Sequence, residues 1–165
     1  MLCHGQNEFT IDVITSKLKF LTWEEAFDCL KDDTIPGRLR AKYCELIITL
    51  YVDIVSNVSV IDRVRLSYNY EGIASDESTL DQSSSPTTEY FPELRDWIAY
   101  FLGNNGDMTA SEIGHNMLVK QVLRLVYYLV MYGFYNKRED MDSLLKPLMS
   151  LLDGRNDKPY PDTAR

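Results

Sequence analysis

Few side chains in this 165-residue sequence have the chemistry of an enzyme active site. Attack by a serine or cysteine needs a base beside it, and the candidate bases are two histidines, His4 and His115. On a helical wheel His115 falls in an apolar stripe with Val122 and Val126, which favours a packed or hydrogen-bonded histidine over a catalytic one. The motifs G-x-S-x-G, H-E-x-x-H and the P-loop are absent from the sequence. We therefore predict that the protein is not an enzyme.

Metal and cofactor sites also lack a matching ligand pattern. The three cysteines show no C-x-x-C spacing, so neither a zinc site nor a disulfide framework is expected. We interpret Cys29 and Cys44 as buried thiols. A calcium-binding loop with Gly106 at its sixth position would place Glu112 at its twelfth, but Phe101 would then take the first position, which needs a side-chain oxygen. We expect no metal and no cofactor.

Basic side chains near position 40 could contact an anionic group such as a phosphate. Arg38 and Lys42 are one helical turn apart and can converge, whereas Arg40 points to another face. Arg63 and Arg65 could join the first two. The alternative interpretation is a solvated basic edge together with one structural arginine. The formal charge of −8 disfavours a nucleic-acid partner, because such proteins neutralise phosphates with basic residues.

Helical periodicity predicts the elements of the first third of the chain. Apolar spacing predicts a helix over about residues 9–21, and the capping-box pattern from Thr22 to Glu25 opens a second helix. Pro36 suits the first turn of a third helix, which extends to about Ile54. Arg40 lies away from the polar strip of this third helix, so it needs a charged partner. The main apolar stripe contains Leu39, Tyr43, Leu46, Ile47, Leu50 and Ile54, and the opposite side carries Ala41, Ile48 and Val52.

The middle of the chain loses the helical period. Val64–Tyr70 alternates like an extended segment. Residues 71–89 hold five acidic residues, five serines and no lysine or arginine, which predicts a mobile acidic loop. Ser85, which precedes Pro86, is a candidate phosphorylation site, and a solvated linker is the alternative.

Helical signals return after this loop. One helix is predicted from Pro92, and a second capping-box pattern over 109–112 opens the longest helix, which ends near Tyr132 with Gly133 as a left-handed cap. A last helix follows from Asn136, and Pro147 should kink or divide it. The residues of this last helix that are predicted to face inward are Leu144, Leu145, Leu148, Leu151 and Leu152.

These elements predict an all-α protein with an armadillo/HEAT-like helical solenoid of about six helices and a long acidic loop. The expected boundaries are residues 7–153 for the solenoid, interrupted by a flexible acidic loop at 71–90, and 154–165 for a linker. A closed six-helix bundle is the alternative. No apolar run approaches the roughly 18 residues of a membrane-spanning helix, and no signal peptide is recognisable, so we expect a cytosolic protein without a membrane span.

Two stretches resemble a known family. The run Asp33–Asp53 resembles a signature segment of the inositol 1,4,5-trisphosphate receptors and, more distantly, of the ryanodine receptors. The run Val122–Asn136 resembles the long helix and G-F-Y-N turn later in the same region, and Ile11–Leu18 with Cys29–Leu30 resembles the preceding helices. The modest spacing of the two main motifs favours the inositol trisphosphate receptors. The motif residues are Pro36, Leu39, Arg40, Ala41, Gly133, Phe134, Tyr135 and Asn136.

The resemblance implies the ryanodine and inositol trisphosphate receptor homology domain, an armadillo-like solenoid. It implies a segment that relays conformational change between the ligand-binding and pore regions of a tetrameric calcium-release channel, at the cytosolic face of the endoplasmic or sarcoplasmic reticulum. The implied partners are neighbouring domains of the same chain and the other subunits, and no ligand-coordinating residue of the family is carried over.

Two other functions stay open at this stage. The chain could be a free-standing armadillo-like adaptor that binds proteins, or an inositol-phosphate module that uses Arg38, Lys42, Arg63 and Arg65. Residues 159–162 do not resemble a finished terminus, which favours a longer parent chain. If Arg40 is buried and paired, replacing it with alanine should cost roughly 3 to 5 kcal/mol.

Overall fold

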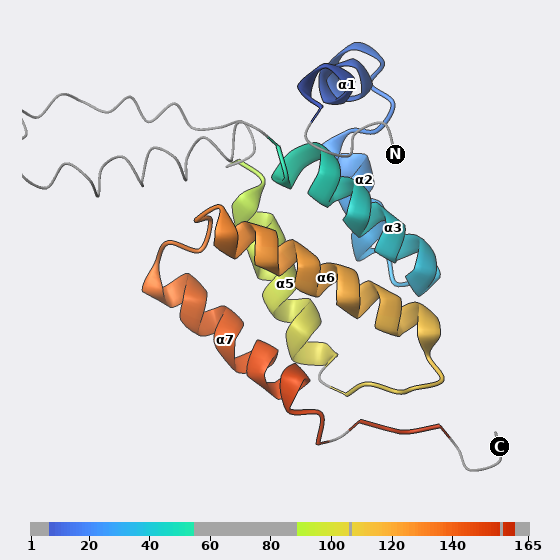
Figure 1. Ribbon diagram of the computed structural model, residues 1–165, viewed down its shortest axis with the longest axis vertical. Coiled ribbons are helices and arrows are strands. Elements are labelled where there is room, and N and C mark those ends of the chain that lie inside the picture. The colour runs from blue at the N-terminus through green and yellow to red at the C-terminus, as the bar shows by residue number, and fades with distance from the viewer. Residues whose placement is uncertain (1–6, 55–88, 106, 156, 161–165) are drawn as a thin grey trace, which may run out of the picture.

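The computed structural model describes residues 7–54, 89–105, 107–155 and 157–160. Every regular element in these ranges is helical, which confirms the all-α prediction, and the one β-type contact is an isolated bridge between Thr109 and Lys158. The extended segment, Arg63, Arg65, Ser85 and nearly all of the acidic loop lie outside the described residues. The elements are α1 (Glu8–Asp12), the π-helix η1 (Val13–Lys17), α2 (Trp23–Lys31), α3 (Gly37–Ile47), the π-helix η2 (Ile48–Val52), α5 (Phe91–Asn104), α6 (Ile113–Met131) and α7 (Arg138–Asp153), shown in Figure 1.

The α2 helix begins with the predicted capping box. The Glu25 amide donates to the Thr22 hydroxyl at 3.3 Å, and the Thr22 amide donates to the Glu25 carboxylate at 3.0 Å. Two amides that the first helical turn would leave unsatisfied thus have partners. The helix buries Trp23, Ala26, Phe27 and Leu30.

The α3 helix begins directly after Pro36, whose carbonyl accepts hydrogen bonds from the amides of Leu39 and Arg40. Its predicted apolar stripe is wrong in part, because Leu39 and Leu46 are largely exposed. The buried residues of α3 are Arg40, Ala41, Cys44 and Ile47, of which Ile47 belongs to the predicted stripe. The α3 helix packs against both α2 and α6, and small side chains such as Ala41 and Cys44 allow neighbouring helices to approach closely.

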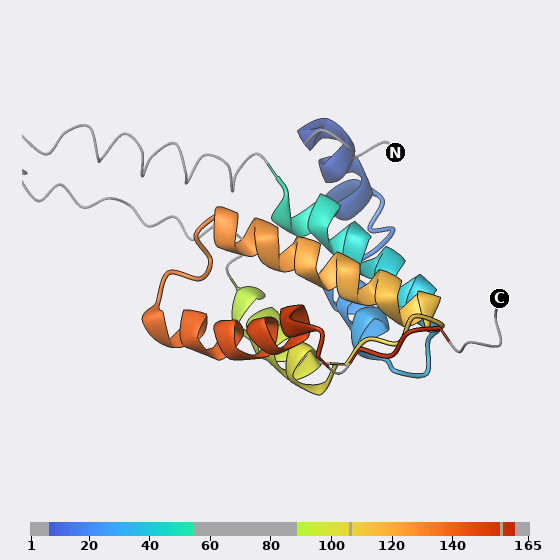
Figure 2. The same ribbon diagram turned by 60° about the horizontal axis from the view of Figure 1, so that its bottom comes forward.

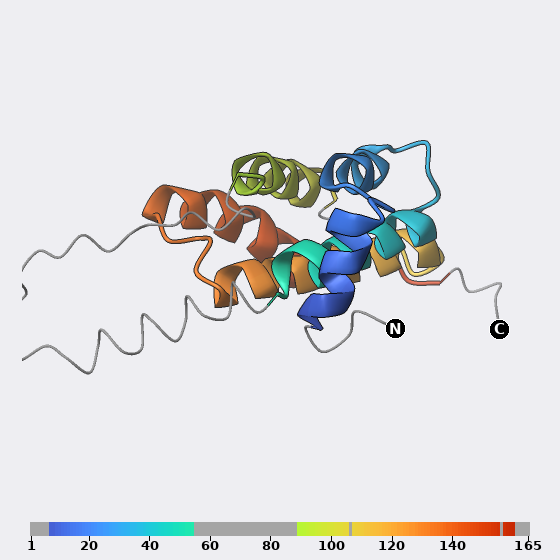
Figure 3. The ribbon, with the colours of Figure 1, turned by 90° about the horizontal axis from the view of Figure 1, so that it is seen from above.

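The helices form two layers. In the view from above, α2 and α5 lie in one layer, and α3 and α6 lie in the other (Figure 3). α3 and α6 are side by side and run in the same direction, as Figures 1 and 2 also show. α7 packs beside α5, on the side away from α2. Successive helices therefore alternate between the layers, and the core lies between them. The fully buried side chains include Phe27, Ile47, Ile98, Leu118, Val122, Leu125 and Leu129.

The two ends of α6 show one correct and one incorrect prediction. At the C-terminal end Gly133 has a φ of +77°, and its amide and that of Phe134 donate to the carbonyls of Val130 and Leu129. This is the Schellman pattern, so the predicted glycine cap is confirmed. At the other end the capping box over 109–112 does not form. The Ala110 amide donates to the Lys158 carbonyl at 2.9 Å, which draws this segment into a contact with the chain beyond α7.

The α7 helix continues through Pro147, so Pro147 does not divide it, and the other form of that prediction, a kink, stays a prediction. It ends at Gly154, which has a φ of +65°. Of the leucines expected to face inward, Leu144 and Leu151 are buried, whereas Leu145 and Leu152 are exposed. The reason is that α7 packs chiefly against α5.

Candidate interaction surfaces

Arg40 occupies a buried position and has the partner that its place in the sequence requires. Its guanidinium donates to the Asp33 carboxylate at 2.6 Å and to the carbonyl of Leu30, near the end of α2, at 2.9 Å. The Asp33 side chain, however, is 83% exposed. Arg40 therefore joins α3 to the end of α2, and the charge of its partner stays in solvent.

The Gly133-to-Asn136 turn places two aromatic rings against the start of α5. The ring centroids of Phe91 and Phe134 are 5.2 Å apart, and those of Phe91 and Tyr135 are 5.3 Å apart. Burial raises the pKa of Tyr135, and its hydroxyl has no hydrogen-bond partner among the described residues. Asn136 is exposed. The rings of Phe134 and Tyr135 thus fasten the turn after α6 to the start of α5.

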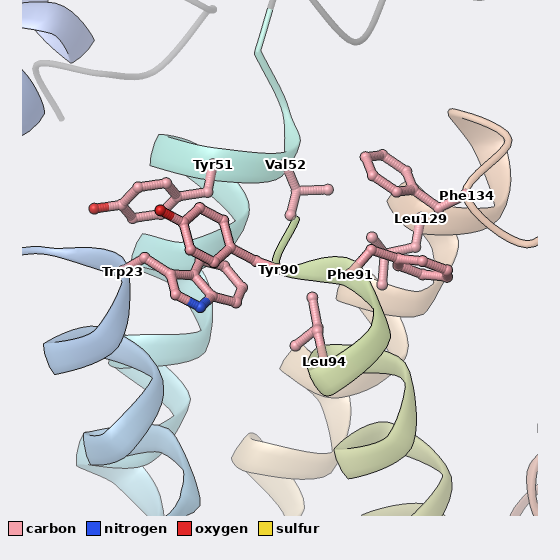
Figure 4. A pocket seen from close by; sticks show the side chains of 8 residues that line it. All are labelled: Trp23, Tyr51, Val52, Tyr90, Phe91, Leu94, Leu129 and Phe134. Carbon is pink, nitrogen blue, oxygen red and sulfur yellow. The ribbon is translucent and has the colours of Figure 1, made fainter. Parts of the chain in front are cut away.

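Aromatic side chains surround a small space at the end of the helices (Figure 4). Trp23 stacks on Tyr90 with ring centroids 4.7 Å apart, and Tyr51 donates to the Leu21 carbonyl. The enclosed space is about 10 Å³, enough for at most one water molecule. This is packed core, not a ligand cavity. The lining residues are Trp23, Tyr51, Val52, Tyr90, Phe91, Leu94, Leu129 and Phe134.

A larger open cleft of about 520 Å³ lies between the α2–α3 pair and α5. Its cations already have partners, because Lys31 pairs with Asp28 and Glu93, and Arg40 pairs with Asp33. His115 is half-buried at this cleft, and its ring packs beside that of the core residue Phe101 with centroids 6.4 Å apart, so it is a packed histidine but not a fully buried one. The cleft is lined by Lys31, Asp33, Arg40, Trp97, Tyr100, Phe101, Asn104, Asn105 and His115.

Of the four basic residues predicted to contact an anion, the structure describes two, Arg38 and Lys42, which both lie on α3. Lys42 pairs with Glu45 at 2.8 Å, and Arg38 is exposed on the same helix. Arg63 and Arg65 lie outside the described residues. The anion site therefore stays a prediction.

The cysteines differ in burial, and no metal cluster is formed by the described residues. Cys44 is completely buried, and burial raises the pKa of its thiol to about 12. Cys29 is only partly buried, so the prediction is correct for one of the two. Cys44 is thus a packing residue, as expected of an un-ionised buried thiol.

Apolar side chains, some of which the wheel patterns place inward, are exposed at both ends of the helix array. On α7 the exposed face holds Leu145, Met149 and Leu152, with Met149 and Leu152 each 65% exposed. At the other end α1 and η1 bury no residue, and Phe9, Leu18 and Phe20 are exposed there. Periodicity alone could not identify these faces, because it shows which residues share a side but not which side is covered.

No protein-family model matches the sequence, and no solved structure matches the chain. Within the described ranges no helix combines the length and the apolar character required to cross a membrane.

Proposed function

We propose that this chain is a non-enzymatic regulatory and scaffolding segment of a ligand-gated intracellular calcium-release channel of the inositol trisphosphate receptor kind. In this proposal it folds as an armadillo/HEAT-like solenoid at the cytosolic face of the endoplasmic reticulum. The observation that carries the proposal is the stacking of two helical pairs, α2–α3 and α5–α6, in the same sense, with apolar faces uncovered beyond them.

The layer arrangement supports a solenoid over a closed bundle. In a solenoid each repeat contacts its neighbours alone, and the end repeats expose apolar surface unless a cap covers it. The exposed faces on α7 and around α1 lie where further repeats would pack. A closed bundle would turn the same side chains inward.

The two family-like motifs support a structural role. The Asp33–Asp53 motif forms the central helix α3 with its Arg40 anchor, and the Gly133-to-Asn136 motif forms the cap that joins α6 to α5. Rigidly joined helices can pass a displacement from one end to the other, because packed interfaces shift as units. Neighbouring domains of the same chain and the other subunits of the tetramer would be the partners.

The experiment that tests this proposal has two parts. The native transcript is sequenced on both sides of these codons, and further helical repeats followed by a pore region are expected. Calcium release evoked by inositol trisphosphate is then measured in permeabilised cells that carry the parent gene with Gly133→Val, which removes the left-handed cap while leaving the ligand-binding and pore regions intact. We expect a reduced release at unchanged ligand binding. A transcript that stops near Arg165 would refute the channel assignment.

The second candidate is a free-standing adaptor, favoured by the exposed α7 face alone. An adaptor would keep this face for a separate partner protein. The short transcript would support the adaptor, and the long one would exclude it.

A further inference from the structure

The outward side of α6 carries a regular stripe of residues. Residues 113, 117, 120, 124, 127 and 131 follow one another at alternating spacings of four and three, the heptad spacing by which two helices pack in a coiled coil. We name this stripe the α6 outer face; it consists of Ile113, Met117, Lys120, Arg124, Tyr127 and Met131. Tyr127 is 60% exposed, the other apolar members are also exposed, and α6 crosses the front of the molecule in Figure 1.

Two cations occupy the centre of this apolar stripe. Lys120 is exposed and Arg124 is half-buried, with its guanidinium over the Tyr128 ring at 5.7 Å, and neither forms an ion pair with any described residue. The whole of α6 contains no aspartate or glutamate, although the chain has a formal charge of −8. The α6 outer face is therefore a cationic, apolar surface on an otherwise acidic protein.

We propose that the α6 outer face binds an amphipathic helix of a partner protein that carries acidic residues at the two central positions of its own apolar seam. The heptad spacing sets the apolar contacts, and charge complementarity to Lys120 and Arg124 sets the register, as polar seam residues do in coiled coils. The 19-residue α6 extends about 28 Å, so the partner helix needs about five turns. This partner is independent of whether the chain belongs to a channel.

The same residues disfavour two other occupants. A second copy of α6 would bring cations against cations in either orientation, because Lys120 and Arg124 lie near the middle of the stripe. A membrane surface would bury these central cations among apolar groups, whereas membrane-bound helices carry their cations on the polar flank. An anionic bilayer would also repel the net charge of −8.

The test uses the full chain and a synthetic 21-residue helical peptide with leucine at the seam positions and glutamate at the two central ones. Binding is measured by fluorescence anisotropy at low and physiological salt. We expect the Kd to rise at least tenfold for Lys120→Glu and for Tyr127→Ser. A peptide with lysine at the two central positions should bind the wild-type chain at least tenfold more weakly, and should bind Lys120→Glu better than it binds wild type.

Lys146→Glu on α7 is the matched control, because Lys146 is an equally exposed lysine on another helix. It should leave the Kd within twofold, and circular dichroism should show that all variants stay folded. The proposal is overturned if Lys120→Glu binds the glutamate peptide as wild type does. Self-association of the chain that Tyr127→Ser abolishes would overturn the proposal in favour of a second copy. Binding to phosphatidylserine-containing vesicles without binding of the peptide would overturn it in favour of a membrane.

Discussion

Arg40 shows how a single side chain joins two helices at modest electrostatic cost. Its guanidinium is buried, but Asp33 remains in solvent, so the ion pair is not the fully buried type expected from the sequence. The more consequential bond is the one to the Leu30 carbonyl, because helix ends leave carbonyls without partners.

We expect Arg40→Ala to lower the free energy of unfolding by about 1 to 3 kcal/mol, since it strands a buried carbonyl but not a buried charge. This value replaces the 3 to 5 kcal/mol of a fully buried pair. Urea denaturation measures the change. Arg38→Ala on the same helix is the control, and it should change the free energy of unfolding by no more than about 0.5 kcal/mol. Asp33→Ala should cost less than about 1 kcal/mol. A larger loss for Asp33→Ala than for Arg40→Ala would contradict the assignment.

Cys44 should make stability depend on alkaline pH. Burial raises the pKa of its thiol from 9.0 to about 12, so near pH 10 only the unfolded chain ionises there. Ionisation of the unfolded chain lowers the free energy of unfolding as pH rises above about 9, by on the order of 1 kcal/mol at pH 10. Denaturation of wild type and Cys44→Ala at pH 8 and pH 10 tests this. The variant should lose less stability between the two pH values, and equal losses would refute the prediction.

At the scale of elements, α3 and α6 are in close backbone contact at their N-terminal ends. A Cβ atom on Gly37 would lie 2.8 Å from the backbone carbonyl of Gly114. Backbone atoms cannot move aside as a flexible side chain can, so Gly37 allows this contact and thereby sets the spacing of the α3–α6 layer.

Gly37→Ala is therefore expected to destabilise the protein by about 1 to 3 kcal/mol, because the two helices must separate. Gly103→Ala is the control, since a Cβ there would meet nothing within 4 Å. In a helix that control should be neutral or stabilising by up to about 1 kcal/mol. Thermal or urea denaturation compares the two. If both substitutions change the free energy of unfolding by the same amount, the contact between Gly37 and the Gly114 backbone does not set the spacing of α3 and α6.

The orientation of α7 can be tested with two adjacent leucines. Leu144 is buried against the core and Leu145 is exposed. Leu144→Ala should cost about 2 to 5 kcal/mol, whereas Leu145→Ala should stay within about 0.5 kcal/mol. Equal costs in urea denaturation would mean that α7 is covered on both sides.

At the scale of the whole molecule, the core does not extend to the N-terminal helices. Neither α1 nor η1 contains a buried residue, whereas every helix from α2 onward contributes to one continuous core. The folded unit therefore begins at α2, and α1 and η1 lie outside it.

Deleting residues 1–17 should consequently change the free energy of unfolding by less than about 1 kcal/mol, because the described part of this segment contributes no buried residue. Leu125→Ala, at a completely buried position in α6, provides the contrast and should cost about 2 to 5 kcal/mol. Both changes in the free energy of unfolding are measured by urea denaturation, and they are compared on the condition that the dependence of this free energy on urea concentration is the same for all variants. A loss of several kcal/mol on truncation would show that α1 and η1 belong to the core.

Local signals in the sequence were sufficient to determine the helices and several of their ends. The Thr22–Glu25 capping box, the Gly133 cap and the need of Arg40 for a partner each depend on residues that are close in the chain or on one helical face. The two caps form at the end of a single helix, and Arg40 meets Asp33 only seven residues earlier in the chain, so these sequence patterns carry over to the structure.

The tertiary structure alone decided which faces are covered. Leu39 and Leu145 share the apolar pattern of their helices, yet both are exposed, because the helices that pack on α3 and α7 leave these sides uncovered. The start of α6 was likewise decided by the distant Lys158 backbone, which the local capping pattern could not anticipate. A helix wheel shows which side chains lie together, whereas the partner of each side depends on contacts between residues far apart in the chain.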